Sequence, residues 1–175
     1  MEETLDTDEE EDESMSEDTQ TGETILDITV VPFEPITPGS GHGVADKQSR
    51  LAEAISDKIQ SGKLAELRKE KASRVVTLTV LFYLWKGSPG GSDTRPVKDI
   101  DNLLKVLLDV LRSGPQGLGI LESDSFVSEL YASKQLVGSE AEEGYRIVVE
   151  EFKDKEMLRT LKAHSGNKQT RAPKP

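Results

Sequence analysis

The alternation of apolar and polar residues predicts four β-strands. The clearest case is the segment from residue 75 to residue 85, where every second side chain is apolar, as in a strand with one buried face. Residues 25–31 are rich in β-branched side chains and precede Pro32, which predicts a first strand. Residues 127–137 and 145–152 predict two more strands near the end of the chain.

A four-residue repeat of apolar side chains predicts a helix between the first two strands. Leu51, Ile55 and Ile59 recur at this spacing and would share one helix face. Asp46 is expected to cap the beginning of this helix, and Gly62 lies where it is expected to end.

A stronger helical pattern covers residues 99–112, where one continuous apolar stripe predicts a helix packed on a core. The stripe consists of Ile100, Leu103, Leu104, Leu107 and Leu111. Residues 63–71 add a short, mostly polar helical stretch. The main elements therefore follow in the order β-α-β-α-β-β. This order predicts one α+β domain over residues 25–152, with a small mixed β-sheet and two main helices packed against it.

The net charge of -11 is concentrated at the N-terminus. Residues 1–24 contain twelve Asp and Glu and no Lys or Arg. Because like charges at this density repel each other and few apolar residues are present, we expect a disordered acidic tail. Without these twelve, 21 of the 33 acidic residues remain against 22 Lys and Arg. The predicted domain is thus nearly neutral, which is compatible with DNA binding.

Two roles fit the acidic tail. In the simpler interpretation it is a solubilising extension. In the other it acts as an intramolecular DNA mimic, which competes with DNA for the protein's own basic surface. At the opposite end, residues 153–175 are rich in Lys and Arg, and we expect a flexible basic tail.

Composition also excludes several classes of protein. The chain has no Cys, which excludes disulfides, thiolate metal sites and cysteine nucleophiles. The first residues lack the basic and apolar stretches of a signal peptide. The longest apolar run, residues 80–85, is too short to span a bilayer. We therefore expect a soluble, cytoplasmic protein with no membrane partner.

Two aspartates stand at the beginning of the second main helix. On a continuous helix, Asp99 and Asp101 would point about 200° apart, so they converge only if Asp99 lies at the cap and Asp101 in the first turn. A purely structural interpretation accounts for both. Asp99 would cap the helix, while Asp101 would complement the helix dipole and pair with Lys105.

A second acidic cluster favours metal chemistry instead. Glu122 and Asp124 follow a Gly-Pro turn, and carboxylates from two separate segments are suited to Mg²⁺, which prefers oxygen ligands. Such a metal polarises a phosphate and generates hydroxide from bound water. Lys105 would neutralise charge that develops on the phosphorane. The alternative for Glu122 and Asp124 is a solvated acidic loop.

The two clusters together resemble motifs of the RusA family of Holliday-junction resolvases. The family's Asp-x-Asp-Asn-x-x-Lys helix start is matched by Asp99, Asp101, Asn102 and Lys105. Its downstream Asp-Asp-x-x-Val segment is matched by residues 123–127, with Ser123 in place of the first Asp. Lys134 stands where family members tend to carry a basic residue. The resemblance spans residues 25–152 and is specific between residues 98 and 134.

The resemblance implies an Mg²⁺-dependent, structure-selective endodeoxyribonuclease. Such an enzyme is a homodimer that binds four-way DNA junctions, makes paired nicks in recombination and repair, associates with the nucleoid and needs no small-molecule cofactor. The catalytic carboxylates, which would also hold Mg²⁺, would be Asp99, Asp101 and Asp124, with Lys105 as the essential lysine. Any ligand role lost at Ser123 would pass to Glu122.

The DNA-binding surface must differ from that of relatives. The loop after the first strand is often basic in the family, but residues 38–43 read Pro-Gly-Ser-Gly-His-Gly here. Contacts to DNA are instead expected from Lys86, Arg95, Lys98, Asn102 and Lys134, or from the basic C-terminal tail. The near-neutral domain and Ser123 leave a second hypothesis open, a non-catalytic junction-binding or adaptor protein on the same fold. In a third hypothesis the acidic tail recruits a basic partner.

Overall fold

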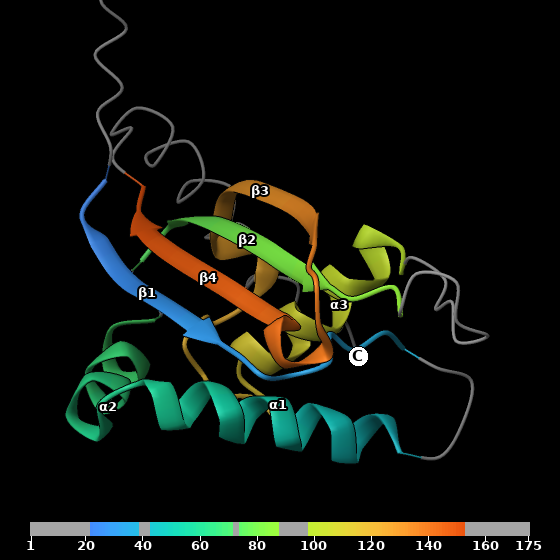
Figure 1. Cartoon of the computed structure of the whole chain (residues 1–175). Coiled ribbons are helices and arrows are strands. Elements are labelled where there is room, and N and C mark those ends of the chain that lie inside the picture. The colour runs from blue at the N-terminus through green and yellow to red at the C-terminus, as the bar shows by residue number, and fades with distance from the viewer. Residues whose placement is uncertain (1–21, 39–42, 72–73, 88–97, 153–175) are drawn as a thin grey trace, which may run out of the picture.

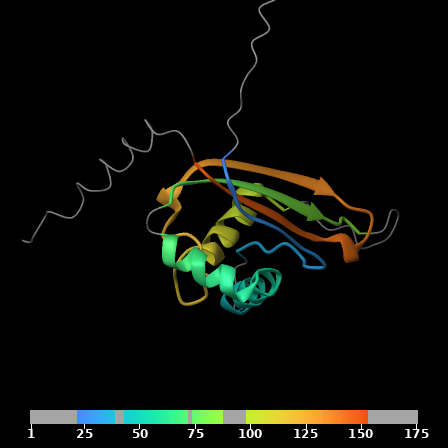
Figure 2. The same cartoon turned by 90° about the vertical axis from the view of Figure 1, so that its left-hand side faces the viewer.

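The computed structural model describes residues 22–38, 43–71, 74–87 and 98–152. In this part of the chain, helices cover one face of a four-stranded sheet and leave its other face open (Figure 1; Figure 2). The elements are β1 (Thr24–Val30), α1 (Val44–Lys58), α2 (Ser61–Glu70), β2 (Val76–Leu84), α3 (Ile100–Leu111), β3 (Val127–Leu136) and β4 (Gly144–Glu151). The expected α+β class with a small mixed sheet is confirmed. The two main helices are accompanied by α2, which occupies the polar helical stretch.

The strand order in the sheet is β1-β4-β2-β3. β4 lies antiparallel to both β1 and β2, whereas β2 and β3 are parallel. Parallel neighbours need a crossover connection, and α3 supplies it between β2 and β3. This crossover places α3 and the beginning of β3 close together, although they belong to separate sequence motifs.

The core lies between the sheet and the helices. On β2 the predicted alternation is confirmed, because every second side chain from Val76 to Leu84 is buried. α3 buries Leu103, Val106, Leu107, Val110 and Leu111. Ile100 and Leu104, which the predicted stripe included, are only partly buried beside this core. Among the described residues, no helix is both long and apolar enough to cross a membrane.

Both predicted ends of the first helix are wrong. α1 begins at Val44, after Gly43, whose φ of 116° lies in the left-handed region that favours glycine. Asp46 lies in the first turn and is not the cap. The helix ends at Lys58 because Ile59 turns to extended backbone and buries its side chain in the core. Gly62 therefore falls inside the first turn of α2.

Tyr145 on β4 joins the segment after β1 to the core. Its ring is fully buried and meets Phe82 nearly edge-on, with 5.5 Å between ring centroids. Its hydroxyl accepts a hydrogen bond of 2.7 Å from the backbone N–H of Ile36. Burial raises the pKa of Tyr145 well above its ordinary value of 10.0. The phenol is thus held in its protonated form.

This raised pKa predicts a loss of stability in alkaline solution. Below pH 10 the phenol is protonated in both states, but above it only the unfolded chain ionises at this residue. The contribution of Tyr145 to the free energy of unfolding should therefore fall by about 1.4 kcal/mol for each pH unit above pH 10. Chemical denaturation of the wild type and of Tyr145→Phe between pH 8 and about 11 measures it. Equal slopes in both proteins would contradict the assignment.

Candidate active site

The exposed side of α3 lines an open groove of about 500 Å³ together with the turn that precedes β3. Its walls are formed by Asp101, Leu104, Lys105, Leu108, Asp109, Arg112 and Asp124. The α3 residues recur at three- and four-residue spacing and therefore share one face of the helix. Asp124 begins the short 3₁₀ turn Asp124–Phe126 immediately before β3. The groove thus brings together carboxylates from both predicted clusters.

Asp99 has the backbone position that the sequence predicted. It is the N-cap of α3, with extended φ and ψ of -69° and 139°, and its carbonyl accepts a hydrogen bond of 3.1 Å from Leu103. Its side chain makes no capping hydrogen bond and is exposed. Side-chain capping, which the structural interpretation assumed, therefore does not explain this aspartate. Asp99 does not line the groove itself, but it stands two residues before Asp101 at the same end of α3.

The expected pair between Asp101 and Lys105 is absent among the described residues. Both side chains are exposed in the first half of α3. The side chain of Asp124 is likewise exposed and has no hydrogen-bond or ion-pair partner in the described part of the chain. The predicted pairing of Asp101 with Lys105 is therefore wrong. Asp101, Lys105 and Asp124 line the groove without an ion-pair partner among the described residues.

The groove is long, and its acidic groups are spread along it. Asp101 and Arg112 are eleven residues apart on or beside α3, which corresponds to about 16 Å. No three acidic or histidine side chains among the described residues are close enough together to hold a metal ion. The donor chemistry nevertheless fits Mg²⁺, because this ion is commonly held by one or two carboxylates and by substrate phosphate. Asp101 in the groove and Asp99 at the adjacent cap of α3 are candidate carboxylates for that arrangement.

Glu122 lies outside the groove. Its carboxylate forms an ion pair of 3.1 Å with Lys71, and it lines a neighbouring depression together with Ser123. Ser123 places its Oγ 2.5 Å from that of Ser125. The structure thus does not bring Glu122 beside Asp101.

The expected DNA-binding residues fall into different surroundings. The Lys98 ammonium donates to Glu34 at 2.6 Å and to the Pro35 carbonyl, while Lys134 donates to the Lys98 carbonyl at 3.2 Å. These two lysines therefore tie the beginning of α3 to its neighbours. Lys86 is exposed, and Asn102 is partly buried. Arg95 lies outside the described residues.

Sequence reasoning missed two charged residues of the groove. Asp109 and Arg112 line it and form an ion pair of 2.7 Å, and Gln48 donates to Asp109 at 3.3 Å. The spacing contained the signal, because Asp101, Lys105 and Asp109 recur every four residues and must share a helix face.

No family model matches the chain, and no curated protein sequence matches it. The likeness to the RusA family therefore rests on the residues between 98 and 134.

Proposed function

We propose that the protein is an Mg²⁺-dependent endodeoxyribonuclease of the RusA type that resolves Holliday junctions. One observation carries the proposal. Asp101, Lys105 and Asp124 come from two separate motifs, yet they line the same open groove. Exposed carboxylates can hold the metal of a metal-assisted phosphodiester hydrolysis, and an ammonium can stabilise the charge that develops on the phosphate. A DNA substrate would place the protein at the nucleoid.

Each group has a role in the proposed reaction. Asp99 and Asp101, at the cap and in the first turn of α3, would hold the metal at the end of the groove. Bound Mg²⁺ would supply Lewis acidity and a hydroxide from water. Lys105, one turn along the helix, would neutralise the charge of the phosphorane. Asp124 lines the groove from the turn before β3 and would orient the attacking water or the phosphate.

The proposal is tested by cutting of a synthetic four-way junction and of a linear duplex with the same sequence. Both substrates are incubated with and without Mg²⁺, and the products are resolved on a denaturing gel. Paired nicks in the junction that require the metal are the expected result. Equal cutting of the duplex would contradict structure selectivity.

A non-catalytic junction-binding or adaptor protein is the second candidate. Two observations favour it: Glu122 is engaged by Lys71, and no three carboxylates come together among the described residues. The same experiment separates the candidates. Tight binding of the junction without cutting, at every Mg²⁺ concentration, would identify the adaptor.

Paired nicks require two active sites, and β3 offers a surface on which two copies would meet. β3 is an edge strand, so one side of its backbone has no strand partner in this chain. It also carries three exposed large apolar side chains, Leu130, Tyr131 and Leu136, at 43%, 58% and 54% exposure. Leu130 and Leu136 share the helix-covered side of the sheet, because they pair with the buried Leu78 and Leu84. We propose a homodimer with antiparallel pairing of β3 to β3.

A Leu130→Glu/Leu136→Glu double variant is expected to separate this dimer. Burial of one leucine contributes about 1.5–3 kcal/mol, so the dimer dissociation constant should rise at least about 100-fold. Sedimentation velocity over a range of concentrations measures it. Val31→Glu is the matched control, since Val31 is an exposed apolar residue, at 36%, next to the opposite edge strand. A dimer that survives the double variant would exclude β3 as the interface.

A further inference from the structure

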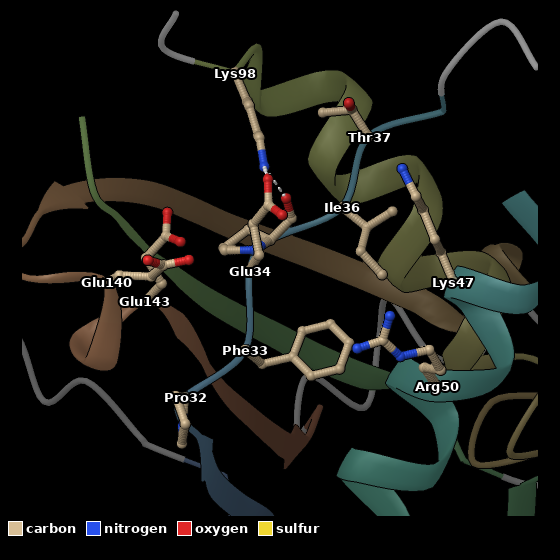
Figure 3. Close-up of a pocket in the computed structure, with 11 residues that line it drawn as sticks. Pro32, Phe33, Glu34, Ile36, Thr37, Lys47, Arg50, Lys98, Glu140 and Glu143 are labelled. Atoms are coloured by element: carbon tan, nitrogen blue, oxygen red, sulfur yellow. Dashed lines mark hydrogen bonds and ion pairs between the residues drawn. The ribbon is translucent and has the colours of Figure 1, made fainter. Parts of the chain in front are cut away.

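A third hollow lies between the segment that follows β1 and the first half of α1, with a volume of about 330 Å³ (Figure 3). Phe33 and Ile36 form its apolar part, and Lys47 and Arg50 of α1 form one wall. Lys98, which immediately precedes the Asp99 cap of α3, lines the same hollow. The hollow therefore lies near the end of α3 at which the proposed metal ligands stand.

Lys47 and Arg50 are the two cations of this hollow that form no ion pair among the described residues. They are three residues apart on α1 and so share a helix face. Both are exposed, and neither forms an ion pair or a side-chain hydrogen bond within the described residues. Lys98 differs from them, because Glu34 lies 2.6 Å from its ammonium. Two neighbouring cations thus line the hollow without an ion pair among the described residues.

The hollow has three acidic residues: Glu34 pairs with Lys98, and Glu140 and Glu143 lie on the side away from α1. Figure 3 shows Glu140 and Glu143 separated from Lys47 and Arg50 by Phe33. The carboxylate of Glu143 is buried and accepts a hydrogen bond of 3.0 Å from the Trp85 backbone N–H. The hollow is therefore polarised, and an anion entering it would be attracted to the α1 wall.

We infer that Lys47 and Arg50 bind a phosphodiester group of the DNA backbone, a role that rests on the proposed function. An arginine fork suits phosphate oxygens because it donates two parallel hydrogen bonds, and a nearby ammonium adds a point charge. The site would hold a junction arm next to the beginning of α3. The site also supplies contacts to the DNA backbone. Lys98 and Lys134 are less available for such contacts, since both already donate hydrogen bonds within the chain.

The test compares two double variants of the full chain. Lys47→Ala/Arg50→Ala removes the proposed site, and Lys58→Ala/Lys69→Ala removes two exposed cations of α1 and α2 that line none of the hollows described above. Fluorescence anisotropy measures junction affinity in Ca²⁺ at several salt concentrations. Plotted against the logarithm of salt concentration, log K has a negative slope. The loss of two phosphate contacts should make this slope shallower by about 1.8. Affinity at low salt should fall at least about 10-fold, with the control within about twofold of the wild type.

The outcomes separate the inference from the proposed function. A wild type that binds the junction, with both double variants weakened equally, would overturn the site and leave the function standing. A wild type with no affinity for DNA would overturn both. Calorimetric titration with a mononucleotide completes the test: tight binding that disappears in Lys47→Ala/Arg50→Ala would assign the site to a free nucleotide and overturn the DNA assignment. Undetectable mononucleotide binding, with the expected loss of junction affinity, supports the inference.

Discussion

Asp101→Asn is expected to lower the rate of junction cutting at least about 100-fold and to leave the fold unchanged. Asn keeps the shape of the side chain but removes the negative charge that a divalent cation requires. Asp101 is exposed and has no ion pair in the described part of the chain, so the free energy of unfolding should change by less than about 0.5 kcal/mol. Single-turnover cutting of a labelled junction at saturating Mg²⁺ measures the rate.

The control for this prediction is Asp57→Asn. Asp57 is an exposed carboxylate near the end of α1 and lines none of the hollows described above. The Asp57→Asn variant should cut the junction at the wild-type rate, and the Asp101→Asn variant should still bind the junction in Ca²⁺. Full activity of Asp101→Asn would remove this residue from the mechanism. Loss of cooperative unfolding would instead indicate that Asp101 is structural.

Phe82→Ala is expected to lower the free energy of unfolding by about 3–5 kcal/mol. Phe82 is fully buried on the inner face of β2, one of the two central strands, and contacts the ring of Tyr145. Truncation would leave a cavity at the centre of the sheet and remove this aromatic contact. Urea denaturation followed by circular dichroism measures the change.

Leu81→Ala is the matched control for Phe82. Leu81 is the adjacent residue on β2, but it faces the open side of the sheet and is only partly buried. Its truncation should cost less than about half as much, because no enclosed cavity forms. Equal losses in the two variants would mean that the open face of the sheet is covered by another part of the protein.

Most of the secondary structure follows from local sequence patterns. The alternation along β2 and the apolar stripe of α3 are local patterns, and burial on one side of each element produces them directly. The motif at residues 99–105 also determined that Asp99 would cap α3 with Asp101 in its first turn, because these positions depend on where one helix begins.

The pairing of groups that are distant in sequence depends on how the elements pack, which no local pattern encodes. Periodicity assigns a residue to a face of its own element, but it does not identify the side chain that approaches from elsewhere. Lys71 reaches Glu122 and Glu34 reaches Lys98 across the fold, whereas Lys47 and Arg50 lack such a partner among the described residues. The end of α1 was decided in the same way, because burial of Ile59 in the core turned the chain before Gly62. The crossover from β2 through α3 to β3 likewise brought Asp124 to the groove of Asp101 and Lys105.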